Sequence, residues 1–324
     1  MSYVNALSHL RPVNWNIVPD PIDLKVRRTV KANNWDENVA ALSKDTRSWS
    51  NLSEAEKDVT CKVFAGLQLL DSLQSEVGIL ALLRHVDNPH EASVLAQFHY
   101  IESIHTETYS KIFQSLAGAS REAQVLEWAN THPFLQKKGW MIEKTYAVDD
   151  PLKVRIASLF LEAFLFYSGF YWPFHLLCKG QLTETASLIK LILRDEAIHA
   201  GYIGYKFRKE KEKLTPEQVK EIEVYILTLL LDLYENEVKY TEDLYYSVGL
   251  ESEVKSFLCL NLNKTLMHLG MAPFFSDEEC QVNPAVKTAV EASEQSLATH
   301  DFFSVSGTAY FMAVRVRSTD ETYQ

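Results

Sequence analysis

The sequence is poor in residues that interrupt helices. Only 11 glycines and 10 prolines occur among its 324 residues, and segments that alternate apolar and polar residues, as strands do, are nearly absent. A β-sandwich or β-barrel needs many short alternating segments separated by turn residues, so both are excluded. Low-complexity linkers are also missing from the sequence. We therefore expect an all-α protein without a flexible hinge between domains.

Cysteine is also scarce. The four cysteines, Cys61, Cys178, Cys259 and Cys280, are scattered and form no Cys-x-x-Cys pair. This spacing does not favour a disulfide framework, and buried or inert thiols in a reducing compartment are the simplest reading. Residues 1–15 lack the basic and then apolar layout of a signal peptide. We expect a cytoplasmic protein.

Basic residues and long apolar runs are few as well. Lys and Arg total 32 against 43 Asp and Glu, which gives a formal net charge of −11. Binding to the phosphate backbone of nucleic acids requires a basic face, so we do not expect nucleic acid as a partner. No uncharged apolar run reaches the roughly 18 residues that a membrane-spanning helix needs, so we expect no membrane span.

Helical periodicity runs through most of the chain. Ser53 followed by Glu56 forms a capping-box pattern that opens a helix. We expect helices over residues 53–84, 91–116, 120–130, 134–147, 151–179, 184–212 and 216–247, and a helical region over 250–300 that is broken at Pro273 and Pro284. These helices are assigned to one domain, residues 1–304. The polar residues 305–324 are expected to form a flexible C-terminal tail.

Two Glu-x-x-His elements, Glu102 with His105 and Glu196 with His199, are the first candidate functional residues. Positions i and i+3 of a helix share a face, so each pair can present an oxygen and a nitrogen to one metal ion. About one such pair arises by chance in a chain of this composition. Spacing alone therefore leaves a solvated helix face as an equally good reading.

A lone carboxylate precedes each of these elements. Asp71 lies 31 residues before Glu102 in the apolar segment GLQLLDSLQ, and Glu162 lies 34 residues before Glu196 in LFLEAFLFYSGF. Burial of an unpaired carboxylate costs several kcal/mol. No basic residue occurs within five positions of Glu162. Its burial would therefore require a cation.

The chain thus contains one motif twice, a lone carboxylate followed by Glu-x-x-His on the next helix. This arrangement is typical of ferritin-like bundles that hold two iron or two manganese ions in a four-helix core. Four carboxylates balance two divalent ions, and oxygen and imidazole donors suit Mn or Fe. We expect a dinuclear Mn or Fe centre, which could store iron, oxidise a substrate or produce a radical.

Tyr109 favours the radical. It follows His105 by four residues, so its phenol should point towards the metals from the same helix face. Phe166, Phe170 and Ile192 lie at helical spacing from Glu162 and Glu196 and could enclose the phenol in apolar contacts. The same residues are explained equally well as ordinary core.

Four segments together resemble the radical-generating small subunit of class I ribonucleotide reductase: LLDSLQ, YIESIHTETYS, FLEAFLFYSGF and LILRDEAIHAGYIGYK. FLFYSGF and HAGYIGYK are similar to the class Ib form. The resemblance extends over nearly the whole chain, and four ordered motifs make it far more specific than Glu-x-x-His alone. It implies metal-binding roles for the following six residues: Asp71, Glu102, His105, Glu162, Glu196 and His199.

The resemblance also implies a route for the radical. Tyr109 would carry a stable tyrosyl radical, which passes by way of Asp195, Trp35 and Tyr310 to a separate large subunit that reduces ribonucleotides to deoxyribonucleotides. Asp195 would hydrogen-bond the second ring nitrogen of His105, the usual arrangement around a metal-bound histidine. A homodimer is implied, and in class Ib a manganese centre activated by a flavodoxin-like protein, although iron and oxygen can also assemble the radical. No Gly-rich phosphate loop is visible, so we expect no nucleotide site in this subunit.

The sequence departs from the family at two places. The residues after Trp35 read DENVAALS, where the family usually has a proline-containing turn. The chain ends in TDETYQ, whereas class Ib tails tend to end in acidic residues followed by Trp and Phe, so Tyr323 would have to serve as the docking aromatic. The second departure bears on the strength of tail docking and on the choice of partner.

Two other functions are compatible with parts of this pattern. A ferritin-like di-metal oxidase or iron-storage protein would share the six ligands but would have no use for Trp35 or Tyr310. A helical scaffold without enzymatic activity would instead pair the four carboxylates with Arg or Lys.

Overall fold

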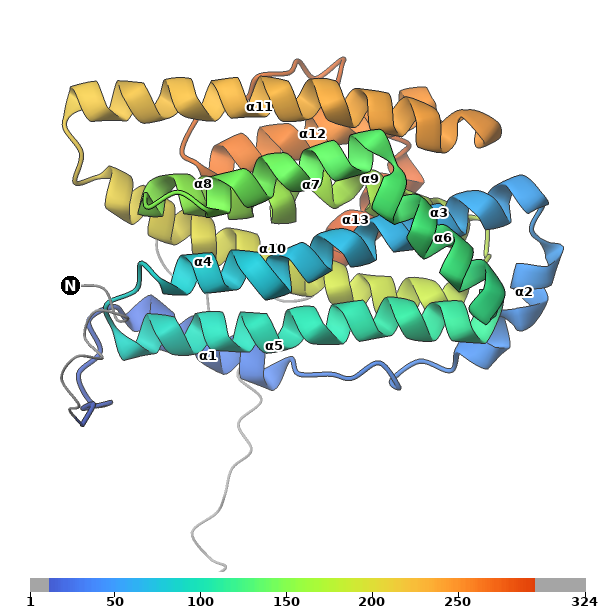
Figure 1. The fold of residues 1–324 in the computed structure, drawn as a ribbon, viewed down its shortest axis with the longest axis horizontal. Helices are drawn as coiled ribbons and strands as arrows, with labels where there is room; N and C mark the ends of the chain where they lie inside the picture. The colour runs from blue at the N-terminus through green and yellow to red at the C-terminus, as the bar shows by residue number, and fades with distance from the viewer. Residues whose placement is uncertain (1–11, 295–324) are drawn as a thin grey trace, which may run out of the picture.

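The computed structural model describes residues 12–294, and within this range the chain is built from helices without a β-strand, as expected (Figure 1). The α-helices are α1 Pro21–Ala32, α2 Thr46–Asn51, α3 Glu54–Leu73, α4 Ile79–Leu83, α5 Pro89–Ile112, α6 Ala119–Thr131, α7 Pro133–Tyr146, α8 Pro151–Phe160, α9 Tyr167–Cys178, α10 Thr183–Lys211, α11 Pro216–Tyr245, α12 Glu251–His268 and α13 Pro284–Glu294.

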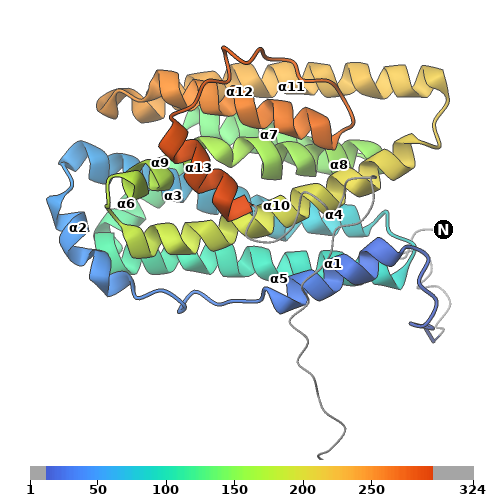
Figure 2. The same ribbon diagram turned by 180° about the vertical axis from the view of Figure 1, so that it is seen from behind.

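Four long helical stretches form the centre of the fold. The stretch α3–α4 packs on α5, the stretch α8–α9 packs on α10, and further contacts between α5 and α10 and between α3 and α9 close the bundle. Figures 1 and 2 show these helices lying nearly side by side, with α11 and α12 covering one side and α1 running along α5 on the other. The two stretches that carry a lone carboxylate thus face the two that carry Glu-x-x-His.

Helix ends follow the signals in the sequence. Ser53 caps α3 in a capping box with Glu56, and Asp150 accepts hydrogen bonds from the first turn of α8. At the other end of the chain, α12 stops at His268, before the expected break at Pro273, because Gly270 adopts a left-handed φ of 69°. No helix lies between α12 and α13, so the expected helical region 250–300 is helical only in part within the described residues.

Three π-helical turns interrupt helices that the sequence predicts as continuous. They are Gln74–Gly78, Phe113–Ala117 and Leu161–Leu165. Glu162 lies inside the third turn, and Asp71 and Tyr109 lie just before the first and the second. A π turn leaves backbone groups without their usual partner, and Thr265 of α12 donates its hydroxyl to the carbonyl of Ala163 at 3.0 Å. The sequence prediction, which rested on apolar periodicity, treated these stretches as continuous helices and did not identify the turns.

The N-terminal helices α1 and α2 were not predicted from the sequence. They are short, and α1 has few apolar residues, of which Val26 and Val30 are buried. Asp20 caps α1 by accepting the Ile22 backbone N–H at 3.1 Å. The loop between these helices carries Trp35, so their attachment to the bundle determines where that indole lies.

The stretch Pro151–Cys178 is long and apolar enough to cross a membrane, by length and composition alone. Its most apolar window is completely buried inside the fold, between α7, α10 and α12. This stretch is therefore the central core helix of the bundle, and its apolar character is explained by packing.

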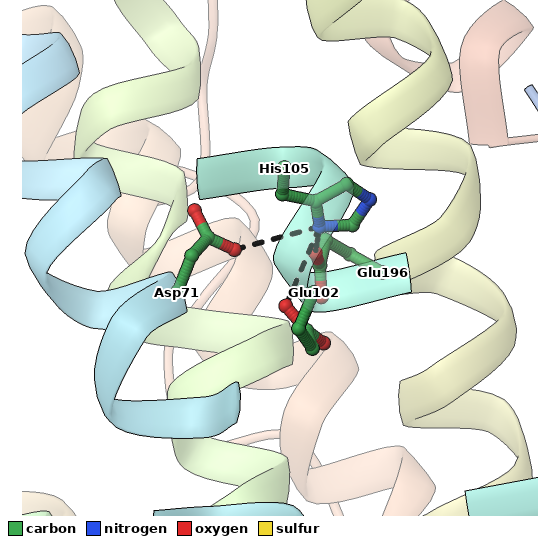
Figure 3. A group of neighbouring side chains, drawn as sticks. All are labelled: Asp71, Glu102, His105 and Glu196. Carbon is green, nitrogen blue, oxygen red and sulfur yellow. Dashed lines mark ion pairs between the residues drawn. The ribbon is translucent and has the colours of Figure 1, made fainter. Parts of the chain in front are cut away.

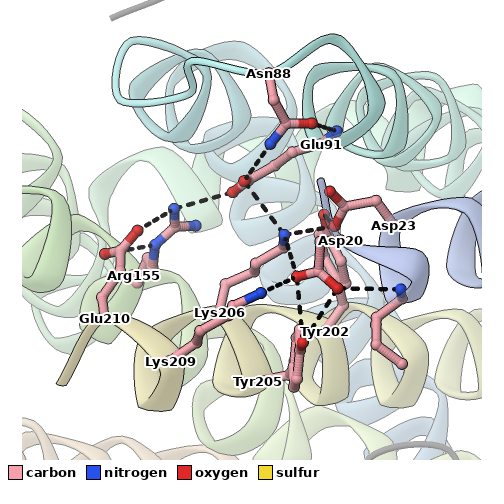
Figure 4. Close-up of polar contacts among 11 residues, drawn as sticks. Asp20, Asp23, Asn88, Glu91, Arg155, Tyr202, Tyr205, Lys206, Lys209 and Glu210 are labelled. Atoms are coloured by element: carbon pink, nitrogen blue, oxygen red, sulfur yellow. Dashed lines mark hydrogen bonds and ion pairs between the residues drawn. The ribbon is translucent and has the colours of Figure 1, made fainter. Parts of the chain in front are cut away.

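A network of buried charges ties α1, α5, α8 and α10 together at one end of the bundle (Figure 4). Lys206 of α10 pairs with Asp23 and, at 3.1 Å, with Asp20. Arg155 of α8 bridges Glu91 of α5 at 3.0 Å and Glu210 of α10 at 2.9 Å. The ion pairs of Lys206 with Asp20 and Asp23 anchor α1 to α10.

Removal of one cation should show how strongly the network holds α1. In Lys206→Met, Asp23 would stay fully buried with the Tyr202 hydroxyl as its remaining side-chain donor among the described residues, so we expect the free energy of unfolding to fall by about 3–5 kcal/mol. Urea unfolding followed by circular dichroism measures it. The control Lys239→Met removes an exposed ion pair with Glu235 and should cost less than about 1 kcal/mol. Equal losses in the two variants would contradict a special role of the network.

Candidate metal centre

All six side chains that the sequence pattern singled out as ligands meet inside the four-helix core. Each is at most 1% exposed, and they arrive from α3, α5, the π turn after α8, and α10. They are Asp71, Glu102, His105, Glu162, Glu196 and His199. Their donor atoms fall into two neighbouring groups, each able to hold one metal ion.

The first group surrounds Nδ1 of His105 (Figure 3). Asp71 Oδ1 lies 3.5 Å from this nitrogen, Glu102 Oε2 lies 3.4 Å from it, and Glu196 Oε1 lies 3.0 Å from it. Three carboxylates from three helices therefore converge on one imidazole. This is a compact set of hard oxygen donors with one nitrogen, of the kind that Mn and Fe accept.

The second group surrounds Nδ1 of His199. Glu102 Oε1 and Glu162 Oε2 each lie 3.0 Å from this nitrogen, and Glu196 Oε2 lies 3.6 Å from it. Glu102 and Glu196 thus place one oxygen in each group. Two carboxylates shared in this way would bridge a pair of ions.

The donor atoms fit metal ions better than any protein partner. Among the described residues, both oxygens of Asp71, Glu102 and Glu196 lack a hydrogen-bond partner although they are buried. Buried carboxylate oxygens are almost always paired or bound to metal. The charged partners of this cluster within residues 12–294 are His105 and His199, not Lys or Arg. The scaffold alternative, which pairs the carboxylates with Arg or Lys, is therefore wrong.

The pKa values of these side chains in the metal-free protein also indicate that the cluster needs positive charge. Burial raises the pKa of Asp71 to about 7, and burial together with the charges of Glu102 and Glu162 raises the pKa of Glu196. Burial disfavours protonated His105, but the carboxylates around it outweigh that cost and hold its pKa well above the usual range. Protons are thus retained near neutral pH where metal ions would supply the positive charge.

Tyr109 is completely buried one turn after His105, as its spacing predicts. Burial and the nearby charge of Asp71 raise the pKa of its phenol well above 10, so the side chain is neutral. Its hydroxyl has no hydrogen-bond partner among the described residues. The ring packed beside it is Phe64 of α3, with centroids 6.0 Å apart, which the sequence pattern did not identify.

The residues expected to enclose the Tyr109 phenol, Phe166, Phe170 and Ile192, are all fully buried. The rings of Phe166 and Phe170 pack on one another with centroids 5.9 Å apart. Their burial agrees both with enclosure of the Tyr109 phenol and with ordinary core packing.

A connected set of polar groups leads from the first group towards the surface. Asp195 Oδ2 lies 3.5 Å from the outer nitrogen Nε2 of His105 and accepts the indole N–H of Trp35 at 2.6 Å. Arg194 donates to Asp195 Oδ1 at 3.1 Å and to the backbone carbonyl of Asn33 at 2.8 Å. The loop around Trp35 is therefore held in place although it lacks the proline-containing turn of the family.

The remaining predicted residues lie away from the centre or outside the described range. Tyr310, Tyr323 and the expected tail 305–324 lie outside residues 12–294. Of the four cysteines, Cys61 and Cys259 are buried, Cys280 is half-buried and Cys178 is exposed. Burial raises the pKa of all four thiols, and that of Cys61 to about 11, which agrees with unreactive cysteines.

Comparison with known proteins identifies the family. The family model "Ribonucleotide reductase, small chain" matches residues 12–284, a range that includes both ligand groups and Tyr109. The chain belongs to the ribonucleotide reductase small-chain family. Ribonucleoside-diphosphate reductase 2 subunit beta of Escherichia coli is 42% identical over 317 residues, which cover 98% of this chain and 99% of that protein.

Other members of the ribonucleotide reductase small-chain family are similarly close. The beta subunit of Mycobacterium leprae is 39% identical over 320 residues, with 99% and 98% of the two chains covered. The crystal structure of dimanganese(II)-NrdF from Streptococcus sanguinis superposes with a TM-score of 0.84 at 42% identity, over 87% of this chain and all of that one. The expected ferritin-like fold and the expected enzyme family are thereby confirmed. Together with the two donor groups, this neighbour supports a dinuclear metal site.

Several residues around the two donor groups escaped the sequence pattern. Phe64 packs on Tyr109, Gln74 bonds Glu162, Tyr146 bonds Gln74, and Arg194 bonds Asp195. Gln74 follows Asp71 by three positions and therefore lies on the same helix face, a signal that was available in the sequence. Tyr146 comes from α7, outside the four ligand-bearing stretches, and only packing brings it near.

Metal binding should release protons. The surrounding carboxylates outweigh the effect of burial and keep His105 and His199 protonated, while burial raises the pKa of Glu196 and, to about 7, that of Asp71. Binding of two Mn(II) ions at pH 7 should therefore release at least two protons per chain. Affinity should rise as the pH increases from about 6 to 8, since the ligands must be deprotonated. A pH-indicator dye and a Mn(II) titration measure the two quantities.

Two variants on α5 provide the controls for proton release. Glu102→Gln removes a carboxylate shared by both groups and should abolish tight binding, whereas Glu107→Gln on the exposed face of the same helix should behave as the wild type. Affinity that does not change with pH would contradict the prediction.

Proposed function

We propose that the chain is the radical-generating small subunit of a class Ib ribonucleoside-diphosphate reductase. It works in the cytoplasm as a homodimer with a separate large subunit that carries out the reduction. The observation that carries this proposal is one buried constellation, in which Tyr109 adjoins the ligand groups and His105, Asp195 and Trp35 form a connected path. An oxidase or a storage protein would need the ligands but not the path.

Two manganese ions are the metals that we favour. Asp71 and His105 would hold one ion, Glu162 and His199 the other, and Glu102 and Glu196 would bridge them. The donor set accepts iron as well, because iron(II) binds such ligands more tightly than manganese(II) and supply in the cell decides. The dimanganese form of the Streptococcus sanguinis relative supports manganese. When bound and activated by a flavodoxin-like protein, the metal pair supplies the oxidising power for a one-electron reaction.

Tyr109 is the side chain that we propose to be oxidised to a stable radical. Oxidation of the phenol removes one electron and one proton, and the Asp71 carboxylate beside the phenol is an acceptor for that proton. The completely buried site excludes water and reductants. Exclusion of both would give the radical a long lifetime.

Asp195 and Trp35 are proposed to relay the radical towards the large subunit. The indole N–H of Trp35 is bonded to the carboxylate that faces His105, and the indole stacks on the His105 ring with centroids 6.0 Å apart. Trp35 is 9% exposed, so it lies at the edge of the core. We further propose that residues 1–304 form one domain, that the tail 305–324 docks to the large subunit, and that Tyr310 continues the relay there.

Replacement of the radical tyrosine tests the central claim. Tyr109→Phe should still bind two metal ions, because it removes no ligand, but should show no tyrosyl doublet in the EPR spectrum and only background nucleotide reduction with the large subunit. The control Tyr245→Phe alters another fully buried tyrosine, which donates to the Ser168 carbonyl, and should keep the signal. Full nucleotide reduction by Tyr109→Phe would refute the proposal.

Replacement of the relay tryptophan separates radical formation from radical transfer. Trp35→Phe should keep the EPR doublet, since Tyr109 and the ligands are untouched, and should lose nucleotide reduction. Trp49→Phe is a matched control, because Trp49 is also 9% exposed but lies in α2. Normal reduction by Trp35→Phe would exclude this relay.

A further inference from the structure

A second buried polar cluster adjoins Glu162, one of the proposed metal ligands. It consists of Gln74, Tyr146 and Ser158, which come from the first π turn, α7 and α8. All three side chains are fully buried, and Gln74 is hydrogen-bonded to Tyr146, to Ser158 and to Glu162. None of them is a metal ligand in the proposed centre.

The amide of Gln74 is the hub of this cluster. Its Nε2 donates to Glu162 Oε1 and, at 2.8 Å, to Ser158 Oγ. Its Oε1 accepts the hydroxyl proton of Tyr146 at 2.6 Å. A neutral phenol that donates its proton can bond only the oxygen end of an amide. Tyr146 therefore determines that the N–H end of Gln74 faces Glu162.

Local backbone structure places the amide there. Gln74 follows Asp71 by three residues and begins the π turn that ends at Gly78. A Cβ atom at position 78 would lie 2.9 Å from the Tyr146 ring and would also collide with the Gln74 amide. Glycine at this position is what allows the glutamine and the phenol to meet.

The two oxygens of Glu162 therefore have different partners. Oε1 accepts a hydrogen bond from the Gln74 amide, while Oε2 lies 3.0 Å from Nδ1 of His199, inside the second donor group. A Lys or Arg in place of Gln74 would neutralise the carboxylate and compete with a metal ion. A neutral donor restrains one oxygen and leaves the negative charge for the ion.

We propose that Gln74 is a positioning residue for the metal centre. It holds Glu162 so that Oε2 is presented to the second ion, and Tyr146 orients the amide for this task. The inference rests on the proposed role of Glu162 as a ligand. Loss of such an outer hydrogen bond typically lowers metal affinity by about 10–100-fold.

Mn(II) binding to the full chain tests the inference. The two stepwise dissociation constants are obtained by competition with a chelating fluorescent dye for the wild type, for Gln74→Met and for Gln68→Met. Methionine keeps the size of glutamine but cannot donate. Gln68 lies in α3, six residues before Gln74, is half-buried, and bonds Thr106 and Ser110 of α5 instead of a ligand, so it is a matched control.

We expect Gln74→Met to weaken binding of one of the two Mn(II) ions by about 10–100-fold and to leave the other unchanged. Gln68→Met should bind both ions as the wild type does. Wild-type constants in Gln74→Met, or equal weakening of both ions in Gln74→Met and Gln68→Met, would overturn the positioning role. A wild-type protein that fails to bind two ions would instead refute the proposed metal centre, which keeps the two failures distinct.

A second variant keeps the test valid if Gln74→Met does not fold, as judged by circular dichroism. Tyr146→Phe retains the Gln74 amide but removes the donor that orients it, so the same ion should bind more weakly, by a smaller factor than in Gln74→Met. Unchanged constants in a folded Tyr146→Phe protein would overturn the orienting role of Tyr146.

Discussion

Four carboxylates buried within a few ångströms of one another are the constraint on which the rest of the structure depends. Asp71, Glu102, Glu162 and Glu196 are each at most 1% exposed, and their charged partners in the described range are two histidines. Such a concentration of negative charge is stable only with cations between the oxygens. The helices are arranged so that this charge is shared by four elements, and no Lys or Arg of residues 12–294 forms an ion pair with it.

At one end of the same bundle, buried carboxylates are instead paired with Lys and Arg side chains. Around Lys206 and Arg155 the buried acids are matched by basic side chains, and the result is an anchor for α1. The metal-facing acids are held by neutral or weakly basic neighbours instead. Gln74 bonds Glu162 without neutralising it, and Asp195 faces the outer nitrogen of His105. The protein thus separates charges that stabilise its fold from charges reserved for ions.

The two buried tyrosines near the ligands, Tyr109 and Tyr146, have different chemical environments. Tyr109 adjoins the carboxylate of Asp71, a base that can take a proton, whereas Tyr146 donates to an amide oxygen, which is a very weak base. Only the first environment favours loss of a proton together with an electron. The path through Asp195 to Trp35 leads away from His105, the ligand nearest in sequence to Tyr109. Radical formation and radical exit are therefore proposed on the same side of the centre.

The sequence by itself determined the all-α class, the long helices and the repeated motif of a carboxylate followed by Glu-x-x-His, because helical periodicity and i, i+3 spacing are local properties. The same locality explains why the six donors and Tyr109 could be named in advance. Only the tertiary structure decided that Glu102 and Glu196 face both donor groups, that Phe64 packs on Tyr109, and that Tyr146 orients Gln74. Those relations join side chains from helices far apart in the chain, and the π turns beside the ligands were not identified from the apolar pattern.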